Sequence, residues 1–381
     1  MRIPRVLAAV GVFGVFAVRQ SMPIAQQASP PAVVLPIEPP AVGLPPEPAS
    51  AAVTKFSFIA YGDTRGQADG QELQREHGLV VDSMLASVKT QAEAGFPVRF
   101  IVQSGDAVLS GRDATQWNVS FTPIIERLTR EGAVPYFFAV GNHDVGRGPV
   151  GDSQRELGLR NTFSAMSKLW PPEGSPRRLN DYPTYAFGYG HMFVVAIDSN
   201  IASDATQLAW VARQLDALDR TRYRHVVAVF HHPPLSSGPH SGPVLEPQAD
   251  AIRRLYLPLF RRHHVRMTIA GHDHLFDHWV EHYDDSTGTY RLDHLVTGGG
   301  GAPIYTYNGE PDLTLYAAAA APQQVRLDHP IKPGPTAADN PHHFVIVEVD
   351  GDRIWLQVIG TGPRPFRPYG RPRIELSDRQ G

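Results

Sequence analysis

The segment YFFAVGNHD, residues 136–144, joins a bulky apolar run to an abrupt polar stop. Residues 136–140 are aromatic or aliphatic, and they end at Gly141, after which Asn-His-Asp follows at 142–144. A short continuous apolar run is typical of a buried strand that is covered on both faces. In open α/β sheets, ligands bind beyond the carboxyl ends of the strands. The segment therefore predicts a strand that delivers polar side chains to a binding site.

The same pattern recurs along the chain, with helical periodicity between the strands at 79–94, 206–218 and 251–263. Such alternation of strands and helices indicates the α/β class. Chance would not readily place carboxylates, an amide and imidazoles at successive strand ends, so we expect these groups to converge into one site. Further apolar runs end at Gly62-Asp63, Ser104-Gly105-Asp106, Asp198-Ser199-Asn200, His231-His232 and Gly271-His272-Asp273-His274.

Composition limits the kinds of function that this chain can have. Its 381 residues, 42% of them hydrophobic, suffice for one large or two ordinary domains. A formal charge of −3 argues against a general nucleic-acid binder, which usually carries a basic excess. The chain has no cysteine, so disulfides and thiolate metal sites are excluded. Oxygen and imidazole ligands remain, and these suit Mn, Fe or Zn.

The N-terminus has the features of a targeting segment. Arg2 and Arg5 precede an uninterrupted apolar run at 6–18, which is short for a membrane span and typical of a signal-peptide core. We expect residues 1–25 to be a signal peptide or an N-terminal anchor. The protein would then be exported, to the periplasm or as a secreted protein, and an uncleaved segment would hold it at the membrane.

The rest of the chain divides into three segments by composition. Residues 26–53 are rich in proline and are expected to form an extended linker. Residues 54–362 contain the strands and helices of the predicted domain, including a hairpin around Asp-Gly-Asp at 350–352. Residues 363–381 carry arginines among prolines and are expected to be a solvated tail.

The polar motifs, taken in this order, resemble those of the calcineurin-like metallophosphoesterase superfamily, which also contains the purple acid phosphatases. The resemblance covers residues 56–361 and implies a four-layer α/β/β/α sandwich with two packed mixed sheets. It also implies hydrolysis of a small phosphomonoester or phosphodiester by a metal-bound water, with no covalent enzyme intermediate. The motifs are GDTR at 62–65, GD-x4-G at 105–111, GNHD at 141–144, HHP at 231–233 and GHDH at 271–274.

The resemblance further implies a site for two divalent or trivalent metal ions. His143 would stand over this site as an acid or as a donor to the phosphate. His232 adjoins His231 and could face the metal in its place. The implied ligands are Asp63 and His274 for the first ion, Asn142, His231 and His272 for the second, and Asp106 as the bridge between them.

Arg65 departs from the family's pattern. Most members place a histidine ligand two residues after the first aspartate, whereas purple acid phosphatases place a tyrosine three residues after the bridging aspartate. Arg65 and Leu109 stand at these positions here. Arginine has no acceptor atom and cannot ligate a metal, so the first ion is expected to be the more labile one.

The role of Arg65 is open from the sequence. It could clamp the phosphate through its forked donors, or it could be an ordinary surface arginine. Its presence also allows two alternatives to a two-metal hydrolase. One is a catalytically impaired metal- or phosphate-binding protein on the same fold, and the other is a mononuclear hydrolase that acts on another ester.

Overall fold

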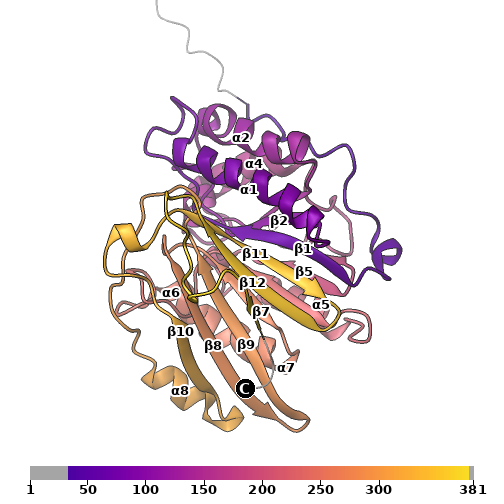
Figure 1. Cartoon of the computed structure of the whole chain (residues 1–381), viewed down its shortest axis with the longest axis vertical. Coiled ribbons are helices and arrows are strands. Elements are labelled where there is room, and N and C mark those ends of the chain that lie inside the picture. Colours follow the sequence, from indigo (N-terminus) through magenta and orange to yellow (C-terminus); the bar gives the residue numbers. More distant parts are fainter. Residues whose placement is uncertain (1–32, 377–381) are drawn as a thin grey trace, which may run out of the picture. The chain divides into compact units, whose positions relative to one another are not determined.

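Two mixed β-sheets form the centre of the part of the chain that the computed structural model describes, residues 33–376 (Figure 1). Within these residues, one sheet has six strands and the other has seven. This arrangement confirms the predicted α/β class and the pair of packed sheets. The predicted signal peptide or anchor at 1–25 lies outside the described residues.

The six-stranded sheet begins with the strands that carry the first polar motifs. β1 pairs in parallel with β2, and β2 in parallel with β3, so the carboxyl ends of all three meet at one edge. β11 and β12 form the predicted hairpin. The strand order is β13 (Ile374–Glu375), β12 (Arg353–Gly360), β11 (His343–Asp350), β1 (Lys55–Tyr61), β2 (Val98–Gln103) and β3 (Tyr136–Phe138).

The seven-stranded sheet carries the histidine motifs. β5, β6 and β7 run parallel, so His231 and the GHDH motif also follow neighbouring carboxyl ends. The strand order is β10 (Arg326–Ile331), β8 (Phe276–Asp285), β9 (Gly288–Thr297), β7 (Met267–Ala270), β6 (His225–Val229), β5 (Met192–Ala196) and β4 (Tyr185–Tyr189).

Helices cover the outer faces of the two sheets. α1 packs on the sheet of β1 and β2, whereas α5 and α7 pack on the sheet of β5 and β6 (Figure 1). All three helices predicted from periodicity are present, and the third is divided into α6, η5 and α7. The α-helices are α1 (Arg75–Glu93), α2 (Thr122–Glu126), α3 (Asn142–Val145), α4 (Ser153–Met166), α5 (Ala205–Asp216), α6 (Pro247–Ala251), α7 (Leu257–Arg262) and α8 (Thr314–Ala320). The shorter or wider helical turns are η1 (Glu47–Ser50), η2 (Gln116–Phe121), η3 (Arg127–Glu131), η4 (Ser199–Ile201), η5 (Ile252–Tyr256), η6 (Ala321–Gln323) and η7 (Ala337–Asp339).

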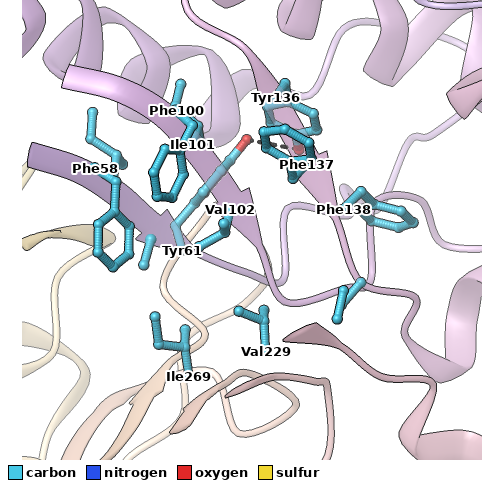
Figure 2. Packing of buried hydrophobic residues seen from close by; sticks show 14 of the residues in the cluster. Phe58, Tyr61, Phe100, Ile101, Val102, Tyr136, Phe137, Phe138, Val229 and Ile269 are labelled. Atoms are coloured by element: carbon cyan, nitrogen blue, oxygen red, sulfur yellow. Dashed lines mark hydrogen bonds between the residues drawn. The ribbon is translucent and has the colours of Figure 1, made fainter. Parts of the chain in front are cut away.

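Aromatic side chains fill the space between the sheets. Phe100 of β2 and Phe137 of β3 contact Phe187 of β4, with ring centroids 5.2 and 3.8 Å apart. Figure 2 shows this cluster, to which Val229 and Ile269 of the second sheet also belong. Burial of large apolar surfaces on the inner faces stabilises the pair of sheets and thereby brings their carboxyl edges together.

The described part of the predicted linker packs against the domain. Val34 and Ile37 are buried, and the Ile37 amide donates to the Ala165 carbonyl at 2.9 Å. Glu47 accepts two hydrogen bonds from the Arg177 guanidinium, at 2.9 and 2.8 Å. Residues 33–53 therefore differ from the spacer expected of their composition, because apolar side chains among the prolines find a surface on which to pack.

The predicted tail also packs as far as it is described. β13 extends the six-stranded sheet, Arg373 forms an ion pair with Glu348 at 2.5 Å, and the Tyr369 hydroxyl contacts His278 Nδ1 at 2.8 Å. These contacts replace the solvated conformation that the arginines and prolines predict. Within residues 33–376, no helix is both long enough and apolar enough to cross a membrane.

Candidate metal centre

The candidate ligands come together where the carboxyl edges of the two sheets meet. The ligand atoms of Asp63, Asp106 and His274 lie within 4.8 Å of one another, and so do those of Asp106, His231 and His272. Asp106 belongs to both groups, which is the arrangement expected of a bridging carboxylate. The sixth predicted residue, Asn142, opens α3 and places its Oδ1 3.1 Å from His231 Nε2.

Three of these residues have left-handed backbone conformations. The φ angles are 60° at Asp63, 55° at Asp106 and 68° at His272. Such conformations cost about 1–3 kcal/mol each and cluster at functional sites. The loops also approach closely: a Cβ at Gly271 would lie 2.1 Å from Asp63 Oδ2, and one at Gly141 would lie 2.2 Å from Asp106 Oδ1. The glycines of the motifs are therefore needed for the aspartates to reach their positions.

Backbone carbonyls orient two of the histidines. His231 Nδ1 donates to the Ser104 carbonyl at 2.9 Å, and His274 Nδ1 donates to the Pro303 carbonyl at 2.7 Å. Each Nδ1 therefore carries the proton, and each Nε2 turns toward the aspartates. His231 Nε2 lies 3.3 Å from an Asp106 oxygen, and His274 Nε2 lies 3.4 Å from an oxygen of Asp63. This is the usual outer support of metal-binding histidines.

Glu246 orients His272 through the other ring nitrogen, Nε2, whereas His231 and His274 are held through Nδ1. His272 Nε2 donates to the Glu246 carboxylate at 3.1 Å, and its Nδ1 faces His231 Nε2 at 3.1 Å. Burial lowers the pKa of His272 to about 4, which favours the neutral ring. Burial opposes a charge on His231, but the charge of Asp106 raises the pKa of His231 to about 9. The site therefore attracts a positive charge between these two nitrogens, and a metal ion fits that requirement.

Asp144 holds the loops that follow β2 and β3. Its buried carboxylate accepts the backbone N–H groups of Asp106 at 2.8 Å, Ala107 at 2.9 Å and Gly141 at 2.7 Å. Burial and the nearby charge of Asp106 raise the pKa of Asp144 to about 8. The pKa of Asp106 itself is held well below its usual value by His231, against the effect of burial. Asp144 thus joins the loop after β2 to the loop after β3.

Arg65 enters the site. Its Nε lies 3.5 Å from Asp106 Oδ2, and its Nη2 lies 3.5 Å from His274 Nε2. Its side chain is 16% exposed, which excludes an ordinary surface arginine. Arg65 also lines a cavity of about 700 Å³, together with Thr64, with Arg75 at the start of α1, and with the segments around Pro303 and His342. Its position is consistent with contact to a ligand that enters from this cavity.

His143 and Leu109 lie on the open side of the centre. The His143 amide donates to Asp106 Oδ1 at 3.0 Å, and His143 Nδ1 donates to the Leu109 carbonyl at 2.7 Å. His143 Nε2 is thereby directed over the bridging position, 3.9 Å from Asp106 Oδ2. The side chain remains 29% exposed, so it can meet a ligand that approaches from solvent.

His232 belongs to a different candidate ligand group from Asp106, the one that it forms with Glu246 and His272. Its Nδ1 lies 2.8 Å from Ser199 Oγ, and its Nε2 has no hydrogen-bond partner among residues 33–376. Ser199 Oγ also accepts the backbone N–H groups of His231 and His232, at 3.1 and 3.0 Å. Of the two neighbouring histidines, the geometry therefore brings His231 to Asp106 and Asn142.

Glu246 is the principal residue of the centre that sequence reasoning missed. Besides holding His272, it accepts from His240 Nδ1 at 3.0 Å and pairs with Arg147 at 3.4 Å. Burial opposes ionisation of Glu246, but the hydrogen bonds from His240 and His272 lower its pKa. It follows no apolar strand and belongs to no recognised motif, so only a general need for carboxylates behind metal-binding histidines could have suggested it.

The chain is similar in sequence and in fold to known phosphoesterases. A family model described as calcineurin-like phosphoesterase matches residues 83–276. A probable purple acid phosphatase 20 of Arabidopsis thaliana is 27% identical over 196 residues, which cover 49% of this chain and 43% of that protein. The match thus spans less than half the length of that curated relative.

Two solved structures share the fold at low sequence identity. The purple acid phosphatase PPD1 from yellow lupin (Lupinus luteus) seeds superposes with a TM-score of 0.59 and 16% identity, over 85% of this chain and 54% of that one. GAP50, described as the anchor in the inner membrane complex of Plasmodium, gives a TM-score of 0.51 and 14% identity, over 86% and 90%. At these identities the superpositions establish the fold alone.

Proposed function

Because the chain belongs to the calcineurin-like phosphoesterase family, we propose that it hydrolyses phosphate esters with two metal ions bound at the centre described above. The observation that carries this proposal is the pair of ligand groups that share Asp106. Ions bound there would supply an activated water and would polarise the phosphoryl oxygens. The proposed ligands are Asp63, Asp106 and His274 for the first ion, and Asp106, Asn142, His231 and His272 for the second.

The protein's own groups would position the ester on the open side of the centre. Arg65 presents guanidinium donors next to Asp106, where they could hold a phosphoryl oxygen in the forked geometry that suits this group. His143 presents its Nε2 from the other side. In its protonated form this ring would donate a proton to the leaving oxygen. We propose Arg65 and His143 as the catalytic residues on these grounds.

The proposed substrate is a small phosphomonoester or phosphodiester. The cavity of about 700 Å³ beside Arg65 is large enough for an organic group attached to the phosphate. A second candidate function is binding of metal or phosphate without turnover. The observation that favours it is Arg65 itself, since its guanidinium contacts two of the groups that would hold the first ion.

The test combines metal analysis with two chromogenic substrates, p-nitrophenyl phosphate and bis(p-nitrophenyl) phosphate. The purified protein is expected to contain Mn, Fe or Zn. It is also expected to hydrolyse at least one of the two substrates. Asp106→Asn should lose activity by at least ~1000-fold and should bind neither ion tightly. Asp152→Asn, at the N-cap of α4, is the matched control and should retain both properties. A protein that stays inactive after metal reconstitution would leave only the binding function.

Export is proposed from the N-terminal sequence alone. Fractionation of cells that express the full chain should place the protein in the periplasm or the medium, or at the membrane if residues 1–25 are retained. Recovery in the cytoplasm, with residues 1–25 still present, would refute the proposal.

A further inference from the structure

Arg65 is directed into the half of the centre that is proposed to hold the first ion. It follows Asp63 by two residues, and its amide donates to the Asp106 carbonyl at 3.1 Å. This hydrogen bond anchors the backbone between the two aspartates. The side chain then extends to His274, which lies 209 residues away in sequence.

The guanidinium reaches the same atoms that a first ion would need. Nη2 faces the Nε2 lone pair of His274, since His274 Nδ1 is already engaged by the Pro303 carbonyl. Nε faces Asp106 Oδ2, while Asp106 Oδ1 is turned toward His231. A guanidinium offers only donors and a fixed positive charge. It lies against these acceptors and repels a metal cation at the same position.

From these contacts we propose that Arg65 and the first metal ion are alternative occupants of the Asp63–Asp106–His274 cluster. The resting protein then binds one ion tightly, on the side of Asn142 and His272, which Arg65 does not contact in the described structure. The first ion enters when a phosphate group draws the guanidinium away from Asp106 and His274. This inference rests on the ligand assignment of the proposed function, and it adds an order to the binding of the ions and the phosphate.

The structure gives the guanidinium freedom to move. Both contacts of Arg65 are 3.5 Å long, at the outer limit of a hydrogen bond. Its buried Nε makes no hydrogen bond of good geometry within residues 33–376. The side chain also borders the cavity of about 700 Å³, so a phosphate that enters there meets the donors of Arg65 directly. A bidentate contact to phosphate is stronger than the two long contacts that it would replace.

The experiment titrates the full chain with Mn²⁺ by calorimetry, and metal content after gel filtration is measured independently. Without phosphate, the wild type should bind one Mn²⁺ tightly and a second about 100-fold more weakly. Millimolar inorganic phosphate should tighten the second site by about tenfold or more. Arg65→Gln, which removes the charge, and Arg65→His, which adds a ligand, should each show two sites within about tenfold of one another without phosphate.

Arg75→Gln is the matched control, since Arg75 lines the same cavity and belongs to neither ligand group. It should leave both Mn²⁺ affinities within about twofold of the wild type. Two equally tight sites in the wild type without phosphate would overturn the inference, and so would a weak second site that persists in well-folded Arg65→Gln. Both readouts are binding measurements, so an inactive protein that binds in this order would refute the proposed hydrolysis and leave the inference standing.

Discussion

Replacement of Asp144 by alanine should loosen two of the loops that carry candidate ligands. The Asp144 carboxylate is fully buried and accepts three backbone N–H groups, those of Asp106, Ala107 and Gly141. One of these belongs to the proposed bridging residue, and another directly precedes Asn142. Alanine would leave all three donors without their acceptor at the base of the centre.

The expected loss of stability follows from these three hydrogen bonds. A buried donor that loses its partner costs about 1–3 kcal/mol. Water can enter the space left by the side chain, which returns part of this cost. We therefore expect Asp144→Ala to lower the free energy of unfolding by about 3–6 kcal/mol. Asp144→Asn keeps an acceptor oxygen and should lose about 1–3 kcal/mol.

Urea unfolding of the chelated protein, followed by tryptophan fluorescence, measures this loss. Asp152→Ala is the control, because Asp152 also accepts two backbone N–H groups, at a partly exposed helix cap, where the expected cost is about 1 kcal/mol. If Asp144→Ala lost no more stability than Asp152→Ala, the carboxylate would not be holding the loops. A normal affinity for metal in Asp144→Ala would contradict the same reasoning.

Three further predictions concern groups outside the proposed ligand set. Glu246→Gln should weaken metal binding on the His272 side by about 10–100-fold, measured by competition with a chelator. Burial lowers the pKa of His77 from 6.5 to about 3. As the pH falls, His77 is therefore protonated in the unfolded chain before it is protonated in the folded protein. Its contribution to stability is complete above pH 6.5 and declines by about 1.4 kcal/mol per pH unit below it. Urea unfolding at pH 7 and 5 should therefore show a smaller acid-induced loss in His77→Phe than in the wild type. Arg155→Met should lower the free energy of unfolding by about 3–5 kcal/mol in thermal unfolding, because it leaves the buried Asp198 carboxylate without its cationic partner. A change below about 1 kcal/mol would argue against a stabilising pair.

Much of the fold and the candidate site could be predicted because the signals are local. The end of each apolar run indicates the end of a strand. The polar residue that follows therefore lies at the edge of the sheet. Asp63, Asp106 and Asn142 were found in this way, and the structure brings them together. The linker was harder to predict, since the packing of Val34 and Ile37 depends on a distant surface and not on the prolines around them.

The residue pattern was thus sufficient for the α/β class and the residues that gather at the strand ends, whereas the two-sheet sandwich followed from the family resemblance. Tertiary structure decided how those residues are oriented. The choice between His231 and His232 depends on Ser104 and Ser199, and the direction of Arg65 depends on acceptors brought from distant parts of the chain. A motif specifies which groups are present, but tautomers and side-chain directions are set by partners that meet only when the two sheets pack.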